Sequence, residues 1–262
     1  MLSDSFDTGA AGEISISASH LKMDDTAQMR AYTQSTGDAG DISLQVETME
    51  VLGGAQITVS VGEQDNLTGT GKKSSLTITA SDAVLISGKT SGITASTMGT
   101  GPSGEIKLQA LQLKLTEGNY ISANSLGKGD VGHIVLDLET LQIQAGSTIQ
   151  SITEDSGQGG NIEIIAAQAV VIKGEKTGIT AESLEGLGQG GNVQIKTRQL
   201  QLTDNAGIAV SALAASNAGS IVLILEDKLE VQAGSLIRAN TGGSGQSGTI
   251  DISAPVVILE NY

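Results

Sequence analysis

The chain of 262 residues has a formal net charge of −15 and contains 35 Gly, two Pro, one Phe, three Tyr, no Trp and no Cys. This acidity argues against nucleic acid and anionic membranes as partners, because phosphate binding needs a basic face. The lack of Cys excludes disulfides, thiolate chemistry and a Cys-based metal site. With so few aromatic residues, the core must be built from Ile, Leu, Val and Ala.

The first ten residues, MLSDSFDTGA, lack the charged and apolar segments of a signal peptide. No stretch approaches the roughly 18 consecutive apolar residues that a membrane-spanning helix needs. We therefore expect no leader on this copy of the chain and no membrane insertion.

Nine segments with the alternation x-apolar-x-apolar follow one another along the chain. They begin at Gly12, Gly40, Ser74, Gly104, Gly132, Gly160, Gly191, Gly219 and Gly248. The intervals between them are 28 to 34 residues. A regular period in this range indicates a solenoid or another repeat architecture. Alternation with a period of two indicates a strand that buries one face.

Each unit continues in the same order. A second alternating segment follows the first, as at Leu113 and Leu115. A residue type that tolerates positive φ then marks a turn, at Gly54, Gly88, Gly146, Gly174, Asn205 and Gly234. A third segment presents Ile57, Ile93, Ile121, Ile149, Ile179, Ile208 and Ile237. Two positions later stand the smaller Val59, Ala95, Ala123, Ser151, Ala181, Val210 and Ala239.

These features predict an all-β chain that folds as a single-stranded parallel β-helix, or β-solenoid. We expect about eight and a half coils of 28–34 residues, with three short strands per coil. Like residues would then stack in columns along a rod on the order of 40 Å long, given about 4.8 Å between strands. An α-solenoid is the competing fold, but IKLQALQLKL at 106–115 alternates strictly and lacks the helical period.

We expect residues 1–262 to form one β-solenoid domain that is part of a longer repeat array. The first residues resemble the end of a preceding coil, and the last coil stops after its second strand. The longest coil places an extra loop at 62–73. GKTSG at 88–92 and GEKTG at 174–178 lengthen two further coils before their third strand.

The segments SSLTITASDAVLISG at 74–88 and SGITASTMGTGPSGEI at 91–106 resemble the repeat region of filamentous-haemagglutinin-like exoproteins. These are large bacterial surface proteins that are exported by two-partner secretion. The resemblance covers residues 12–262 and implies a right-handed β-helix that serves as the stalk or fibre of a secreted adhesin. The family's secretion domain and a distinct adhesive head are not visible in this sequence, so no site residue is carried over.

A catalytic pair of carboxylates on a β-helix would need two acids close together among the outward side chains of the first strand. Their column reads Ser15, Ser43, Thr77, Lys107, Val135, Glu163, Gln194, Val222 and Asp251. Glu163 and Asp251 lie three coils apart, about 14 Å by the strand spacing, whereas paired glycosidase carboxylates lie about 5–9.5 Å apart. We therefore expect no enzyme and no catalytic residues, with a carbohydrate-active β-helix enzyme as an alternative.

No metal or cofactor site is expected either. His20 and His133 are about four coils apart and lack partners for a metal site or a catalytic relay. The glycine-rich segments lack the Asp of the calcium-binding nonapeptide repeat. Loose calcium binding stays open at two acidic loops, 23–28 and 62–69. The outward column of the third strand, which includes Arg30, Thr58 and Thr94, is too mixed for an ice-binding threonine array.

The leading hypothesis is a structural segment of a secreted bacterial adhesin or fibre that provides reach, stiffness and display. Its expected location is extracellular, at the bacterial cell surface, and its expected partner is a glycan or a host surface. A second hypothesis is a filament subunit that associates end to end through its terminal coils, since open strand edges pair readily with other chains.

Overall fold

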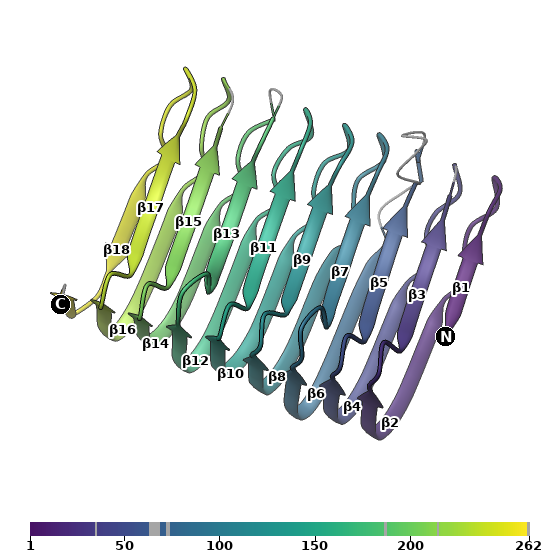
Figure 1. The fold of residues 1–262 in the computed structure, drawn as a ribbon, viewed down its shortest axis with the longest axis horizontal. Coiled ribbons are helices and arrows are strands. Elements are labelled where there is room, and N and C mark those ends of the chain that lie inside the picture. The colour runs from purple at the N-terminus through teal and green to yellow at the C-terminus, as the bar shows by residue number, and fades with distance from the viewer. Residues whose placement is uncertain (35, 63–68, 72–73, 186–187, 214, 261–262) are drawn as a thin grey trace.

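The computed structural model describes residues 1–34, 36–62, 69–71, 74–185, 188–213 and 215–260. The described residues form parallel strands and no helix, and they wind into a β-solenoid with two sheets (Figure 1). The A sheet contains β1 (Leu2–Ser5), β3 (Gln28–Thr33), β5 (Gln56–Val61), β7 (Gly92–Thr97), β9 (Tyr120–Ser125), β11 (Thr148–Thr153), β13 (Gly178–Ser183), β15 (Gly207–Ala212) and β17 (Leu236–Thr241). The B sheet contains β2 (Ile14–Met23), β4 (Ile42–Val51), β6 (Ser75–Ile86), β8 (Glu105–Leu115), β10 (Ile134–Gln144), β12 (Ile162–Lys173), β14 (Val193–Thr203), β16 (Ile221–Gln232), β18 (Ile250–Ser253) and β19 (Val256–Glu260).

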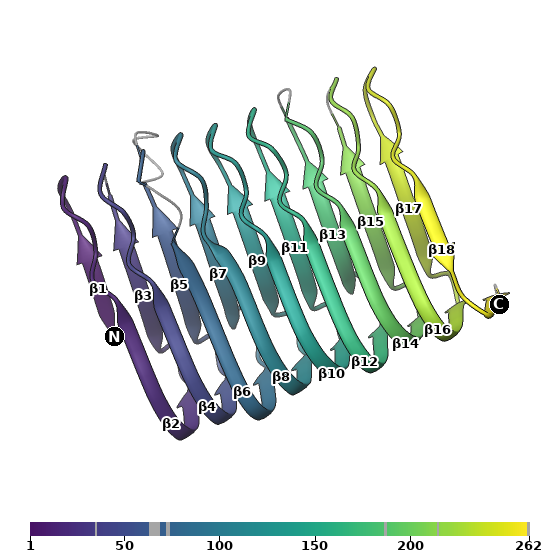
Figure 2. The same ribbon diagram turned by 180° about the vertical axis from the view of Figure 1, so that it is seen from behind.

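Each strand pairs in parallel with its equivalents one coil before and one coil after it, and the order runs without exchange from one end of the rod to the other (Figures 1 and 2). The register joins equivalent residues, so that Ile121 lies between Ile93 and Ile149. The predicted parallel β-solenoid is therefore confirmed. One sequence repeat corresponds to one coil, so residues one repeat apart lie in the same column.

The core consists of these aliphatic columns. The isoleucines of the A sheet from Ile57 to Ile208 have no exposed surface. They belong to the same hydrophobic cluster as the B-sheet residues Leu113 and Leu115, so the inner faces of the two sheets share one core. Burying a side chain of this size contributes about 1.5–3 kcal/mol, which explains how the rod is stable with almost no aromatic residues.

The structure differs from the expectation of three separate strands in each coil. The first two predicted segments run on as one long B-sheet strand, with a shift of register at the bend in several pairs, as between Leu138 and Thr140. Backbone pairing continues on both sides of such a bulge, and alternation in sequence cannot distinguish a bulge from a corner. Only in the last coil is the strand divided, at Pro255, which has no N–H to donate.

The predicted turn residues lie where the chain passes from the B sheet to the A sheet. All six have positive φ, from 63° at Asn205 to 109° at Gly174. The lengthened segments at 88–92 and 174–178 occupy the same corner and contain further residues with positive φ, Thr90 at 69° and Lys176 at 58°. The positions of these turns are confirmed. The predicted loop at 62–73 falls largely on residues 63–68 and 72–73, which lie outside the described residues.

At the other corner, a buried hydroxyl group at the end of an A-sheet strand holds the loop that follows. Thr97, Ser125 and Ser183 donate hydrogen bonds to the carbonyl oxygens of the glycines four or five residues later, at 2.8, 2.5 and 2.9 Å. Val61 shares this column and has no hydroxyl group. The longest insertion in the chain follows Val61.

This column allows a matched test of one hydrogen bond. Thr97→Val should lower the free energy of unfolding by about 1–3 kcal/mol, because the buried Gly101 carbonyl loses its partner. Thr33→Val should leave stability unchanged or raise it, because the buried hydroxyl of Thr33 has no hydrogen-bond partner. Urea denaturation of both variants measures the difference. Equal losses in the two variants would show that the hydrogen bond is unimportant.

Candidate functional site

The outward column searched for carboxylates lies on the B sheet in the predicted register. Glu163 is flanked by Val135 and Gln194, and Asp251 by Val222. The structure therefore brings no second acid beside either residue within this column. It offers no pair of carboxylates there for glycoside hydrolysis.

The two histidines make separate contacts in different coils. His20 Nδ1 lies 2.7 Å from Thr48 Oγ1, and His133 Nδ1 accepts a hydrogen bond from the backbone N–H of Asn161 at 3.1 Å. Within the described ranges, no group of three or more His, Cys, Asp and Glu side chains is arranged to hold a metal ion.

Of the two acidic loops, only the first is fully described. Asp24 forms an ion pair with Lys22 at 3.3 Å and accepts a hydrogen bond from the Asp25 backbone. The acids of the loop at 62–69 are outside the described residues. In the part of the chain that is described, no helix has the length and apolar character that a membrane crossing requires.

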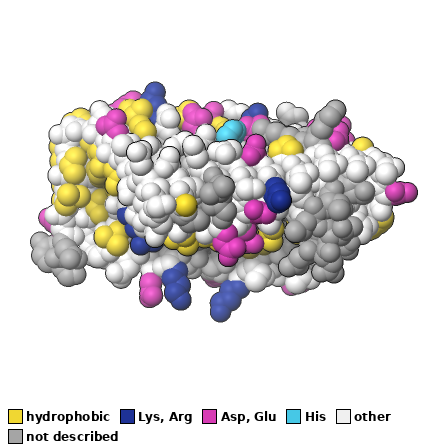
Figure 3. Space-filling view, turned by 90° about the horizontal axis from the view of Figure 1, so that it is seen from above, with side chains coloured by type: hydrophobic (Ala, Val, Ile, Leu, Met, Phe, Trp, Pro, Cys, Tyr) yellow, Lys and Arg dark blue, Asp and Glu magenta, His cyan; other side chains and the backbone are white. Residues whose placement is uncertain are grey.

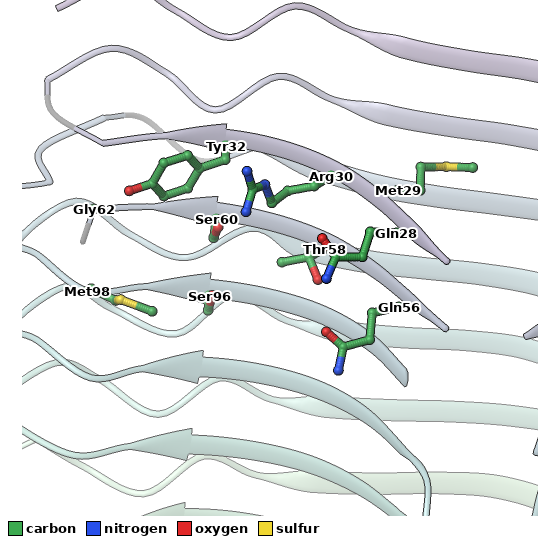
Figure 4. Close-up of a pocket in the computed structure, with 10 residues that line it drawn as sticks. All are labelled: Gln28, Met29, Arg30, Tyr32, Gln56, Thr58, Ser60, Gly62, Ser96 and Met98. Carbon is green, nitrogen blue, oxygen red and sulfur yellow. The ribbon is translucent and has the colours of Figure 1, made fainter. Parts of the chain in front are cut away.

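A cavity of about 330 Å³ lies on the outer face of the A sheet, across β3, β5 and β7 (Figure 4). Strand alternation turns Gln28, Arg30 and Tyr32 outward, and the parallel register places Gln56, Thr58 and Ser60 directly beside them. The residues around the cavity are Gln28, Met29, Arg30, Tyr32, Gln56, Thr58, Ser60, Gly62, Ser96 and Met98. Most of its lining is therefore hydroxyl, amide and aromatic.

Arg30 and Tyr32 are held in place by the first coil. Arg30 donates two hydrogen bonds to the Asp4 carboxylate, at 3.0 and 2.5 Å. The Arg30 guanidinium lies 5.2 Å from the centre of the Tyr32 ring, and Phe6 packs edge-on against that ring at 6.2 Å. The hydrogen bonds to Asp4 raise the pKa of Arg30 above its ordinary value. The charge of Arg30 is therefore matched by Asp4.

On the opposite side, Tyr120 covers a glycine of the neighbouring coil. A Cβ atom on Gly92 would overlap the Tyr120 ring, so the ring lies directly over this position. Gln56 Nε2 donates to the Tyr120 hydroxyl and to the Thr90 carbonyl, each at 3.2 Å. The Gln56 amide is thus fixed in orientation at the edge of the cavity.

The floor of the cavity holds polar groups. Ser60 and Ser96 are each only 7% exposed. The hydroxyls of Ser60, Ser96 and Thr58 and the amide of Gln28 line the cavity, and each can both donate and accept a hydrogen bond. Hydroxyl and amide groups beside a tyrosine ring suit the recognition of a polar ligand.

A second hollow, of about 320 Å³, lies further along the same face over β13, β15 and β17. Its floor contains Gly178 and Gly207, and no aromatic ring lies among its described lining residues. The cavity at β3–β7 is therefore better equipped to recognise a ligand with both apolar and hydroxyl surfaces.

The sequence predicts that Arg30 and Thr58 face outward but does not reveal this cavity. The available signal was the rarity of aromatic residues: two of the three tyrosines, Tyr32 and Tyr120, lie at or beside it. Their proximity depends on pairing across coils, which one repeat unit does not reveal.

Fold and surface together define the class of the molecule as a parallel β-solenoid repeat protein. No protein-family model, curated protein or solved structure matches the chain.

Proposed function

We propose that this chain is a non-catalytic stalk or fibre segment of a secreted bacterial surface adhesin, with the role that its resemblance to filamentous-haemagglutinin-like exoproteins implies. The observation that carries this proposal is the order of the strands, which in both sheets pair coil by coil from the first coil to the last. A continuous hydrogen-bonded ladder resists bending, and each coil mainly contacts its neighbours. Such a rod provides reach and displays its outer face.

The acidic surface supports the same role. The chain has 29 Asp and Glu against 14 Lys and Arg, and the outward A-sheet column that contains Arg30 and Arg238 has hydroxyl, amide or alanine side chains between these two residues. Net negative charge keeps an extended surface soluble and limits non-specific association. An enzymatic role has less support, because the outward B-sheet column that contains Glu163 and Asp251 does not place two acids on neighbouring coils.

The test is the location of the native protein. Antibodies raised against this chain should label intact cells of the producing bacterium, and mild external protease should remove the label while cytoplasmic proteins survive. Labelling that requires cell lysis would contradict an extracellular role. Incubation with a glycan panel should give no release of reducing ends, and turnover would favour the enzyme alternative.

End-to-end association with a second copy is a further candidate, because strand edges at the end of a sheet can pair with another chain. The last coil has its B-sheet part, β18 and β19, beyond β17, whereas β1 belongs to the A sheet and precedes β2. Strand β1 of a second copy would extend the A sheet beside β17 and complete that coil. Its Asp4 would then lie diagonal to Arg238, with the two-residue offset that joins Asp4 to Arg30 within the chain.

The last coil also exposes apolar side chains that are buried in the equivalent columns of other coils. Leu259 is 71% exposed although its partner Val231 is buried, and hydrophobic side chains gather at the C-terminal end in the space-filling view, on the left in Figure 3. A second copy stacked on this coil would bury these side chains.

Leu259→Asp should therefore prevent end-to-end association, because it places a charge against the core of the adjoining coil. Sedimentation velocity over a range of concentrations measures the effect. Ile258→Asp is the matched control, since Ile258 shares an outward column with Glu230. Association that survives Leu259→Asp, or that is lost equally in the control, would contradict this mode of stacking.

A further inference from the structure

We propose that the cavity over β3, β5 and β7 binds one uncharged hexose unit of a surface glycan. This inference rests on the proposed display function and assigns a ligand class to one position on the rod. The ligand would lie on the outer face of the A sheet, against Tyr32 on one side and the amides of Gln28 and Gln56 on the other (Figure 4).

The size and position of the cavity suit a sugar ring. Its volume of about 330 Å³ is at the lower end of the roughly 300–1,000 Å³ typical of small-molecule sites. The floor is formed by short side chains, Thr58, Ser60 and Ser96, between the longer side chains at each end. A ring can therefore approach the sheet closely, while the rest of a glycan chain remains outside.

The polar groups match the hydrogen-bonding needs of sugar hydroxyls. A hydroxyl group both donates and accepts, and so do the amides and hydroxyls that line this cavity. Ser60 and Ser96 are each only 7% exposed and line the cavity, so their hydroxyls can exchange hydrogen bonds with a ligand that approaches the sheet. The Gln56 amide is already oriented by Tyr120 and Thr90, which lowers the entropy lost on binding.

The apolar surface lies at one end of the cavity. Tyr32 and Met98 are together there, opposite the two glutamine amides (Figure 4). A pyranose ring has an apolar C–H face as well as hydroxyl groups, so it can contact an aromatic side chain and hydrogen-bond acceptors at the same time. A simple anion or an entirely apolar ligand would use only part of this lining.

The charges indicate an uncharged sugar. Arg30 is the charged residue among the described lining residues, and Asp4 already neutralises it through two hydrogen bonds. An acidic sugar would have to compete with Asp4 for the guanidinium. It would also approach a chain with a net charge of −15, which disfavours polyanions.

Filling the cavity tests the proposal. Ser60→Ile should lower the affinity for neutral oligosaccharides at least tenfold, or about 1.4 kcal/mol, because the larger side chain occupies the floor. Ser211→Ile is the matched control: Ser211 stands in the same outward column, on β15, and is 6% exposed. The same column already contains Ile152, so isoleucine fits this position of the sheet. The control should leave affinity unchanged.

The measurement is saturation-transfer NMR followed by calorimetry on the full chain, with cello-, manno- and galacto-hexaose as neutral probes and hexagalacturonate as the acidic probe. A second variant, Gln28→Ala, removes an outward amide without filling the cavity and should also weaken binding. It keeps the test decisive if Ser60→Ile fails to fold. Absence of neutral-probe binding, tighter binding of hexagalacturonate, or equal losses in Ser60→Ile and Ser211→Ile would each overturn the proposal.

The outcomes separate this inference from the stalk role. A chain that labels at the cell surface but binds none of the neutral probes retains the stalk role and loses the proposed ligand. A chain that binds a neutral probe through Ser60 but is found only inside cells retains the sugar site and loses the adhesin role.

Discussion

Gly132→Ala is expected to disrupt the rod at its centre and to lower the free energy of unfolding by at least about 3 kcal/mol. A Cβ atom on Gly132 would overlap the carbonyl carbon and oxygen of Gly104, the equivalent glycine one coil earlier. Both groups belong to backbone that is fixed by the neighbouring strands, so neither can move aside easily. Denaturation with urea, followed by circular dichroism, measures the loss.

Gly207→Ala is the matched control. Gly207 also lies in the stacked backbone, on β15, but a Cβ atom there would come no closer than 3.9 Å to its nearest neighbour, the Leu236 carbonyl oxygen. Its φ is not among the positive values. Alanine should therefore change stability by less than about 1 kcal/mol, in the stabilising direction. Equal destabilisation by both variants would mean that backbone overlap is not what requires glycine at 132.

Ile179→Ala should lower the free energy of unfolding by about 2–5 kcal/mol, because it removes a fully buried side chain and leaves a cavity in the isoleucine column. Ile179 lies between Ile149 and Ile208, so three neighbouring coils lose contacts. Ile179→Val should cost only about 0.5–1.5 kcal/mol. The gradation between the two variants follows the volume removed.

Thr180→Ala provides the control for this column. Thr180 follows Ile179 in β13 but faces outward, and a surface substitution of this kind usually changes stability by less than about 0.5 kcal/mol. Hydrogen exchange should locate the effect of Ile179→Ala, with protection lost first in β11, β13 and β15, because a solenoid transmits stability through nearest neighbours. Loss of protection confined to the ends of the rod would contradict this account.

These experiments separate two requirements of the repeat. Glycine is needed where backbones of adjacent coils meet at a corner, and branched aliphatic residues are needed where side chains of adjacent coils stack. Both requirements come from the same parallel register, which places residue upon equivalent residue.

The sequence by itself determined the repeat period, the inward columns and the turns between the B and A sheets. Ile93, Ile121 and Gly146 could be assigned in this way because burial by alternation and positive φ are local properties, repeated in every coil. The sequence did not determine whether each B-sheet segment is one strand or two. A bulge, such as that after Leu138, and a true corner both interrupt the alternation of apolar residues.

Only the tertiary structure revealed the cavity. Gln28, Ser60 and Ser96 come from three coils, and their meeting depends on register and on neighbours that one repeat does not contain. Asp4 fixes Arg30, and Tyr120 reaches across Gly92 to Gln56. The repeat pattern depends on the inward side chains that hold the rod together and therefore predicts the rod, whereas the shape of the outer surface depends on contacts between coils.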